Sequence, residues 1–421
     1  MKEVAGPSRG VPQAAALFLL ALGISQVIYG ADRVSFGVLV PHILKAFSLS
    51  SAVAAGTAAT IFLLGQAAVL LFAGWLCDRW GRKQVMIIGM VLFSIAVLGS
   101  GLSRTFGELI VMRLLTGVGE GFFLPAAVSI AGAAFARNRG AAVGFVDATF
   151  SLGLIAGPIL TAALVGNDVS GWRSPLVVFG VVGLGLAIVV QLLMDSSRAN
   201  ARIHGAESTA ADEVSQRRPS SASEHSARRF IGAATVMYLL WGLAFWPFLG
   251  LAPTFLIKVQ HFPLAAAAAA ATAGGIGVLL LSVPLGALAD RIGRLQVIAA
   301  SALLVAGGAA LFFNLSMTTT LAAVLYFVVE GVGIGALFTN LTAFTQDIAP
   351  QGHLGTSIGF VYTFVYVLAA FSGPIFGAVV GGMGWRWAST IVIVAPMLCL
   401  AVFALGTAKM IRPGLLVQSR S

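Results

Sequence analysis

The sequence predicts an all-α membrane protein with twelve transmembrane helices, arranged as two pseudo-symmetric six-helix bundles. Three observations lead to this prediction: the apolar composition, the long apolar segments, and a repeat that relates the two halves of the chain. Of 421 residues, 58% are hydrophobic and 10% are charged, whereas a soluble domain averages about 25% charged residues. The chain has too few polar groups to cover a water-facing surface. The alternation typical of membrane β-barrel strands is absent, so we expect helical spans.

Apolar segments near the length that crosses a bilayer, about 20 residues, follow one another along the chain. The first starts too early and is too long for a cleavable signal peptide, and no small-residue cleavage site follows it. We expect twelve spans, at residues 12–42, 52–76, 84–102, 106–134, 140–165, 174–194, 230–258, 264–289, 295–314, 318–345, 354–380 and 387–408.

The polar segment 195–229 separates the first six spans from the last six. It is rich in Ser, Ala and charged residues and lacks apolar periodicity, so we expect a flexible cytoplasmic linker. The predicted domains are an N-terminal six-helix bundle at 1–194 and a C-terminal six-helix bundle at 230–421, joined by this linker.

The net charge of +10 comes from Lys and Arg residues that gather in alternate loops. By the positive-inside rule, we expect both termini and the linker in the cytoplasm, and the protein in the plasma membrane, or the inner membrane of a bacterium. This topology explains the basic residues, so we expect no nucleic-acid partner. Cys77 and Cys399 lie in or beside spans on the cytoplasmic side, so we expect no structural disulfide.

Five features of the first half recur in the second half at a nearly constant offset of 212–216 positions. This agreement indicates duplicated six-helix domains, for which a binding site between the halves near mid-membrane is typical. The paired features are Pro41 with Pro253, Gly74–Lys83 with Gly286–Arg294, Gly117–Gly119 with Gly331–Gly333, Gly157–Pro158 with Gly373–Pro374, and Gly171–Arg173 with Gly384–Arg386.

One of these repeated features is a charged loop of the pattern G-x-x-x-D-R-x-G-R, present once in each half. Its glycines permit close approach of helix ends, and its charges can bridge neighbouring helix termini. We expect such contacts to hold an outward-facing state and to break when the cytoplasmic side opens. Positive-inside anchoring alone is the alternative, but it does not require an aspartate among the basic residues. The residues with an expected gating role are Gly74, Asp78, Arg79, Gly81, Arg82, Asp290, Arg291 and Arg294.

These loops resemble the signature of the major facilitator superfamily. The first loop is complete, and the second lacks the final basic residue, where Leu295 stands. The resemblance covers essentially the whole chain and implies the major facilitator fold, with transport by alternating access.

Small residues recur along four of the predicted spans, where they fit tight helix packing. Bending at the two Gly-Pro steps during transport is a sharper alternative. The residues are Gly117, Gly121, Gly153, Gly157, Gly331, Gly335, Gly373 and Gly377.

Ionisable residues inside the spans carry most of the functional information, since charge at membrane depth is costly and marks transport paths. Asp32 and Arg33 lie at or beyond the middle of the first span. Arg113 and Glu120, seven residues apart in the fourth span, share one helix face about 10 Å apart along the axis. We expect the two pairs to approach the same level of one cavity.

Two interpretations of these pairs are open. They can be inert salt bridges that fasten two helices together. Alternatively, protonation of Asp32 or Glu120, favoured by burial, releases Arg33 or Arg113 to bind an anionic group, for which guanidinium is well suited. Anion and proton then bind with positive coupling, which is symport. We favour the second interpretation, because two arginines are a costly way to fasten helices in a membrane.

Two short motifs resemble the anion:cation symporter family, which includes sugar-acid, organophosphate-related and sialate transporters. They are Tyr29-x-x-Asp32-Arg33 and Arg113-x-x-x-Gly117-x-x-Glu120-Gly121-x-x-x-Pro125. The resemblance implies proton-coupled uptake of organic anions, with the acidic residues as proton sites and the arginines near the substrate carboxylate. The chain departs from the family at Ser35, where Asn is frequent, and at Ala136–Arg139, where the usual Pro and Glu-Arg are missing. The substrates of the family therefore do not transfer.

Other polar residues in the spans are less specific. Asp147 is a second proton site, an acceptor for a substrate hydroxyl, or a cap for an internal amide. Glu330 is best explained as a bond between helices, since no arginine shares its span. The expected substrate contacts are Arg33, Arg113, Tyr29, Trp241, Asn340 and Tyr362. Further polar-aromatic candidates of the second half are Tyr238, Trp246, Thr342, Thr345, Gln346 and Tyr366.

The repeat copies the scaffold but not the charges. Asp32 and Arg33 correspond to Ala244 and Phe245, and Glu120 corresponds to Ile334. We therefore expect a lopsided cavity, in which the first half holds charge and protons and the second half selects the rest of the substrate.

Together these features predict a secondary active transporter that takes up a small organic anion, such as a monocarboxylate or a sugar acid, with protons. The absence of a Walker-type motif argues against ATP drive. We expect no enzyme activity, cofactor or metal, and a monomer whose partners are the anion, protons and the bilayer. The alternative is a proton-coupled antiporter that exports drugs or metabolites, for which cavity acids without two arginines are typical. A nutrient sensor is a more distant alternative, disfavoured by the short tails and ordinary linker.

Overall fold

The apolar segments form helices, because in lipid each backbone polar group must find its hydrogen-bond partner within the chain. The computed structural model describes residues 13–48, 52–134, 139–165, 171–195, 221–350 and 352–410, and these contain no strand. The first half forms α1 (Gln13–Ala46), α2 (Ala52–Trp80), α3 (Arg82–Leu102), α4 (Phe106–Ala134), α5 (Arg139–Val165) and α6 (Arg173–Asp195). The second half forms α8 (Ser221–Lys258), α9 (Leu264–Ile292), α10 (Arg294–Asn314), α11 (Thr319–Val332), the π-helix η2 (Gly333–Phe338), α12 (Thr339–Ile348), α13 (Leu354–Ser389), the π-helix η3 (Thr390–Val394) and α14 (Ala395–Met410).

Twelve membrane-length segments follow from these elements. Ten runs of the described residues are long and apolar enough to cross a membrane, and the last of them, Leu354–Met410, has 57 residues. Gly384, with φ 80° and ψ 169°, breaks that run into two crossings. The 34-residue helix α1 supplies one more. The predicted all-α fold with twelve spans is confirmed.

One predicted boundary is wrong. Helix α8 begins at Ser221, inside the segment expected to be a flexible linker. Residues 221–229 are Ser, Ala, Glu, His and Arg, which a helix accommodates at small cost, so the helix extends beyond the apolar span. Residues 196–220 of the expected linker lie outside the described part.

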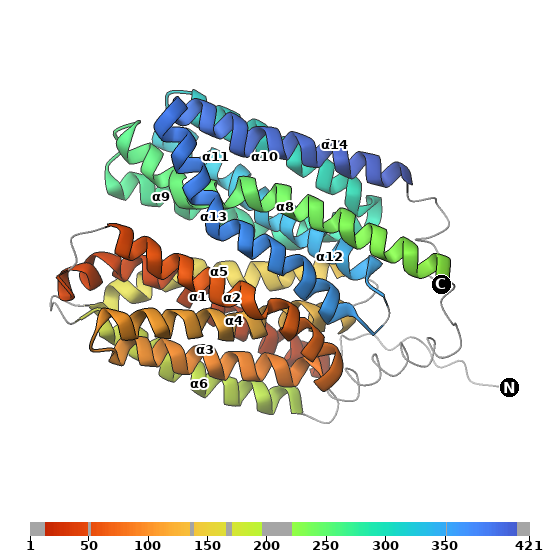
Figure 1. Cartoon of the computed structure of the whole chain (residues 1–421), viewed down its shortest axis with the longest axis horizontal. Helices are drawn as coiled ribbons and strands as arrows, with labels where there is room; N and C mark the ends of the chain where they lie inside the picture. The colour runs from red at the N-terminus through yellow and green to blue at the C-terminus, as the bar shows by residue number, and fades with distance from the viewer. Residues whose placement is uncertain are drawn as a thin grey trace.

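The two halves pack as the repeat predicts. Figure 1 shows α1–α6 gathered in one bundle and α8–α14 in the other. Within the first bundle α1 packs on α5, α2 on α4, and α3 on α6; within the second, α8 packs on α13, α9 on α11, and α10 on α14. Between the bundles, α2 contacts α13 and α5 contacts α9. Each half thus presents two helices to the other in a pseudo-symmetric interface.

Glycines set how closely the halves approach. A Cβ atom on Gly74 would lie 2.2 Å from the Gly355 carbonyl oxygen, and one on Gly286 would lie 2.1 Å from the Gly140 carbonyl oxygen. These contacts lie at the end of the bundle that carries Asp78 and Asp290, which we call the motif end. Only glycine permits this backbone contact, so the motif end is closed tightly in this structure.

The expected packing role of small residues holds for most of them, but not for two. A Cβ atom added to Gly117 or Gly153 would lie within 2.5 Å of the backbone of a neighbouring helix. One added to Gly373 or Gly377 would have no neighbouring atom within 4 Å. At Gly373 and Gly377, α13 therefore lacks the close contacts that the glycines of α5 make with α1 in the first half.

Candidate functional site

The centre of the candidate site is the guanidinium group of Arg33 on α1. Its Nη1 donates to the hydroxyl of Tyr29 at 2.7 Å, to Glu120 Oε2 at 3.2 Å and to Gln66 Oε1 at 3.3 Å. Only 10% of the Arg33 side chain and none of the Glu120 side chain is exposed. The ion pair between Arg33 and Glu120 therefore joins α1 to α4 in a nearly dry environment.

Four aromatic rings surround this guanidinium group, and we call them the aromatic cage. The rings of Tyr29 and Phe62 lie 5.7 and 5.5 Å from Arg33 Cζ, and those of Trp246 and Tyr366 both lie at 5.3 Å. Such distances allow cation–π attraction. Tyr29 and Phe62 come from the first half, whereas Trp246 and Tyr366 come from the second. The cage therefore closes only when the two halves meet.

One nitrogen of the Arg33 guanidinium group makes no hydrogen bond to the residues that the structure describes. Its Nη2 is buried, and no described residue accepts a hydrogen bond from it. The same is true of the indole nitrogen of Trp246. Buried donors normally find acceptors, because an unmade bond costs about 1–3 kcal/mol. Two donors of the same cage are therefore available to an acceptor such as a carboxylate.

The second arginine, Arg113 on α4, faces Asp32 on α1. Its Nη1 lies 4.0 Å from Asp32 Oδ2, its Nη2 donates to Ser100 Oγ at 3.2 Å, and its Cζ lies 4.7 Å from the Phe36 ring. Neither oxygen of Asp32 has a hydrogen-bond partner among the described residues. The contact between Arg113 and Asp32 is therefore a loose ion pair rather than a hydrogen-bonded one.

The four charges thus pair across the two helices. Arg33 pairs with Glu120 and Arg113 with Asp32, so each helix contributes one acid and one base. The structure brings all four together, as their positions in the spans predict. Both interpretations of the pairs, as fasteners and as exchangeable partners, begin from this arrangement.

The polar residues predicted in the second half are largely bonded to each other. The Thr342 hydroxyl contacts those of Tyr238 and Tyr362, the latter at 2.7 Å. Asn340 Nδ2 donates to the Ala336 carbonyl at 2.8 Å, while Oδ1 of Asn340 has no partner in the described residues. The amide oxygen of Asn340 therefore has unused hydrogen-bonding capacity, as do Gln346 Oε1 and Trp246 Nε1.

Trp241, also predicted to contact substrate, bonds a π-helix. Its indole nitrogen donates to the carbonyl of Gly333 at 2.7 Å, and its ring stacks on Phe245 with centroids 5.0 Å apart. Gly333 begins η2, and π-helices leave carbonyls outside the regular α-helical pattern. The indole N–H is thus already used by the fold, which sequence spacing alone could not show.

Asp147 and Glu330 lie apart from the arginines. Asp147 on α5 accepts a hydrogen bond from the hydroxyl of Thr339, at the start of α12 in the other half. Glu330 is buried on α11 and approaches Gly274 of α9. Asp147 therefore joins the two halves, whereas Glu330 lies within the second half. No group of three His, Cys, Asp or Glu residues in the described part is arranged to hold a metal.

At the motif end, the two predicted aspartates reach across the interface. Asp78 accepts hydrogen bonds from the backbone N–H groups of Gly355 and Thr356, at 2.8 and 2.7 Å, at the start of α13. Asp290 accepts bonds from Gly140 and Ala141, at 3.1 and 3.2 Å, at the start of α5. Each half therefore supplies an acid to a helix N-terminus of the other half.

The predicted basic residues of the loops differ in their contacts. Arg294 pairs with Asp290 at 2.9 Å and also with Asp347. Arg79 is exposed and lies over the ring of Trp75, 5.4 Å from its centroid, and Arg291 is also exposed. Arg294 therefore contributes ion pairs at the closed interface.

Comparison with known proteins gives the family. A model of the Major Facilitator Superfamily matches residues 22–372 and 264–414, which together span most of the chain. The chain belongs to the Major Facilitator Superfamily. Among solved structures, the chain resembles the major facilitator proton:xylose symporter XylE, with a TM-score of 0.73, 18% identity, and coverage of 95% of this chain and 96% of that one. The superfamily and its fold, predicted from the loop signatures, are confirmed.

Curated relatives of this major facilitator protein are transporters. A probable sulfoacetate transporter of Cupriavidus necator is 26% identical over 87% of this chain and 88% of its own length. A gallate transporter of Pseudomonas putida and a probable L-galactonate transporter of Escherichia coli are each 31% identical, over 40% of this chain and 37% of theirs. None of these is an enzyme, in agreement with the sequence analysis.

Several contacts of this major facilitator protein were not predicted. Arg139 Nη1 donates to Asp347 and to the Gln346 carbonyl, both at 3.0 Å, and Gln346 Nε2 donates to the Val128 carbonyl at 2.8 Å. These bonds add to the closure of the motif end. The sequence shows that Arg139 and Asp347 are charged and lie beside the ends of predicted spans. Spacing along the sequence does not reveal which loops of opposite halves meet, so these contacts could not be predicted.

Proposed function

We propose that the protein is a secondary active transporter that takes up a small organic anion, such as a monocarboxylate or sugar acid, together with protons. The observation that carries this proposal is the unpartnered Nη2 of Arg33, held in a cage built from both halves. An arginine with a free donor is suited to a carboxylate. The printed names of relatives, which include sulfoacetate, galactonate and gallate, support an anionic substrate.

Coupling to protons follows from the ion pairs. While Glu120 is ionised it occupies Nη1 of Arg33, and while Asp32 is ionised it attracts Arg113. A proton on either carboxyl group weakens its hold on the arginine and leaves positive charge for the anion. The bound anion in turn disfavours ionisation of that carboxyl, so the two ligands assist each other. Tyr29 and Gln66 remain to orient the guanidinium group.

The proposed cycle starts from an outward-facing state. The aspartate contacts and backbone approaches close the motif end, and the distribution of basic residues favours that end in the cytoplasm. We accordingly propose a plasma-membrane protein with cytoplasmic termini, working as a monomer. Rocking of the halves breaks the contacts of Asp78 and Asp290, opens the aromatic cage, and gives the anion access to the cytoplasm.

Uptake into proteoliposomes tests this function. With an inward proton gradient, radiolabelled benzoate or galactonate should accumulate in vesicles that contain the wild-type protein. Arg33→Ala should reduce accumulation at least about tenfold, since a charge-assisted hydrogen bond contributes about 1.5–3 kcal/mol. Arg104→Ala, an exposed arginine in a loop, is the matched control.

Three outcomes would contradict the proposal. Normal accumulation in both Arg33→Ala and Arg113→Ala would remove the arginines from substrate binding. Loss of labelled substrate from preloaded vesicles, driven by the inward proton gradient, would instead identify the export antiporter. Accumulation that ignores the proton gradient would remove the coupling.

A further inference from the structure

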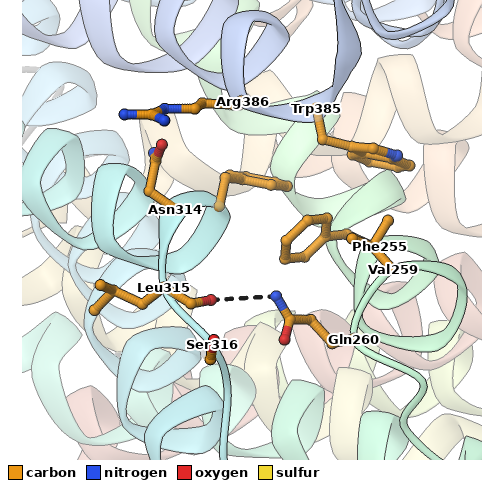
Figure 2. A pocket seen from close by; sticks show the side chains of 9 residues that line it. Phe255, Val259, Gln260, Asn314, Leu315, Ser316, Trp385 and Arg386 are labelled. Carbon is orange, nitrogen blue, oxygen red and sulfur yellow. Dashed lines mark hydrogen bonds between the residues drawn. The ribbon is translucent and has the colours of Figure 1, made fainter.

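A hollow of about 350 Å³ opens in the second half, at the end of the bundle opposite the motif end. Figure 2 shows Trp385 and Phe255 on one side of it and Arg386 and Asn314 on the other. The rings of Phe255 and Trp385 lie 5.5 Å apart. The hollow is open rather than enclosed, and its volume lies at the lower end of the range of small-molecule pockets, about 300–1,000 Å³. It is remote from Arg33, so the proposed transport mechanism does not use it.

The repeat shows how the first half fills the corresponding place. Arg173, the counterpart of Arg386, bonds the end of α3: its Nη1 donates to the carbonyls of Ser103 at 2.5 Å and Gly101 at 3.3 Å. Its Cζ also lies 4.5 Å from the ring of Trp172. Arg173 therefore has a structural task, the bonding of helix C-terminal carbonyls.

In the second half, a residue other than Arg386 bonds the C-terminal end of the corresponding helix, α10. Leu315 is the C-cap of α10 as Ser103 is the C-cap of α3. Its carbonyl accepts a hydrogen bond from Gln260 Nε2 at 3.2 Å, shown dashed in Figure 2, and Gln260 Oε1 accepts from the Met317 backbone at 3.1 Å. The helix end is thus bonded without Arg386, which is exposed at the edge of the hollow.

One ring of the first half has no counterpart beside the hollow. In the first half Phe47 packs against Trp172, with centroids 5.6 Å apart, and against Phe106, at 6.1 Å. With the offset of 212, Val259 stands where Phe47 stands, and it lines the hollow. The side chain at the edge of the hollow is therefore smaller than its counterpart, while Phe313 stands where the first half has Gly101.

We propose that this hollow is a second anion site, which binds a small aromatic carboxylate. The partly exposed ring of Trp385, backed by the buried rings of Phe255 and Phe313, offers a surface to an aromatic ring, and the guanidinium group of Arg386 offers two parallel donors to a carboxylate. The site goes beyond the proposed function, since it involves no residue of the Arg33 centre. In the proposed orientation it lies on the side from which uptake begins.

Equilibrium binding in a background without the central guanidinium group tests this site. Arg33→Ala protein in phosphatidylcholine nanodiscs is titrated with 4-fluorobenzoate and followed by ¹⁹F NMR. Saturable binding is expected, and addition of Arg386→Gln should raise the dissociation constant at least tenfold. Val259→Phe, which restores the ring of the first half, should have the same effect. If the Arg33→Ala protein does not fold, the titration is made with protein that keeps Arg33 and is expected to show two binding steps. The weaker step is then compared between protein with and without Arg386→Gln or Val259→Phe.

Arg173→Gln is the matched control. It should lower the melting temperature without weakening binding, whereas Arg386→Gln should leave the melting temperature unchanged. Unchanged binding in Arg386→Gln would overturn the proposal, as would equal binding of neutral 4-fluorobenzamide. Loss of binding when phosphatidylglycerol is added would assign the hollow to a lipid headgroup and would also overturn it. Since the readout is binding and not transport, a failure of the proposed symport leaves this test intact.

Discussion

Arg33 and Arg113 have the same charge and face the same pair of helices, yet their surroundings differ. Arg33 has three acceptors on Nη1 and four rings around it, and its Nη2 lacks a partner. Arg113 lies against Asp32, Ser100 and Phe36, all in the first half. At the scale of single residues, Arg33 is therefore placed to bind the anion and to contact the second half. Arg113 is placed to stabilise the ionised form of Asp32.

Glu120→Gln tests the proton role of the partner of Arg33. Glutamine imitates the protonated acid, so anion exchange between the two sides should continue while gradient-driven accumulation is lost. In the wild type, accumulation should rise as external pH falls, because protonation frees the arginine; in the variant this dependence should disappear. Uptake and counterflow in proteoliposomes measure both effects. Glu108→Gln, at an exposed acid, is the control, and full gradient-driven accumulation in Glu120→Gln would exclude Glu120 from coupling.

Trp246→Ala tests the contribution of the second half to the aromatic cage. Cation–π contacts contribute about 0.5–2 kcal/mol, so loss of this ring should raise the half-saturation concentration for the anion roughly 2- to 30-fold. Initial uptake rates over a range of anion concentrations measure this change. Trp387→Ala, at a tryptophan that is 56% exposed, should have no such effect. An unchanged half-saturation concentration in Trp246→Ala would show that the cage does not form in the substrate-binding state.

At the scale of elements, the notable contacts are the helix N-termini that receive their acids from the other half. The N-cap residue of α13, His353, makes no side-chain capping bond, and Asp78 at the end of α2 accepts from the first N–H groups instead. Asp290 at the end of α9 does the same for α5. A carboxylate at a helix N-terminus is favoured by unbonded N–H groups and by the helix dipole. These contacts can therefore hold the motif end closed.

Asp78→Asn should loosen that closure, and Cys77 can report it. Cys77 is buried beside Gly355 at the interface, whereas Cys399, the other cysteine, is exposed and can be replaced by Ser. In a Cys399→Ser background, Asp78→Asn should raise the rate of Cys77 alkylation by N-ethylmaleimide at least about tenfold, since hydrogen bonds to charged groups contribute about 1.5–3 kcal/mol. Glu108→Gln should leave the rate unchanged. An equally unchanged rate in Asp78→Asn would show that this contact does not hold the closed state.

At the scale of the whole molecule, the two halves meet in three layers. The aspartates and glycines close the motif end, Asp147 bonds to Thr339 between the halves, and the cage joins them around Arg33. The repeat makes the first layer pseudo-symmetric. The charged site is not symmetric, because Ala244 and Phe245 occupy the positions that correspond to Asp32 and Arg33. Motion of one half as a rigid body would change all three layers together.

Rigid-body motion predicts coupling between the two symmetric loops. Asp290→Asn breaks contacts between α9 and α5, whereas Cys77 lies between α2 and α13. If the motif end opens as one unit, Asp290→Asn should also accelerate alkylation of Cys77, and the double variant with Asp78→Asn should show the product of the two effects. The same alkylation assay measures it. Acceleration by Asp78→Asn alone would indicate local loosening instead of a common opening.

Much of this description was accessible from the sequence, for identifiable reasons. Apolar composition predicts membrane helices, and the offset of the repeat predicts two equivalent bundles. The charges of Asp32, Arg33, Arg113 and Glu120 stand out because few ionisable residues occur in the spans. Trp241 is also predicted to bind substrate, but the sequence does not show that its N–H is bonded to a π-helix carbonyl. Periodicity does not predict π-helices, so this contact was not accessible.

The sequence by itself determined the helices, their number, the duplication, and the identity of the charged groups at membrane depth, because these depend on local composition and spacing. Only the tertiary structure decided that Arg33 pairs with Glu120 and that Trp246 and Tyr366 complete its cage. It also decided that Arg173 bonds the C-terminal end of α3, whereas Gln260 and not Arg386 bonds the corresponding end of α10. Such pairings depend on which helix faces meet, and that is fixed by the packing of all the helices together.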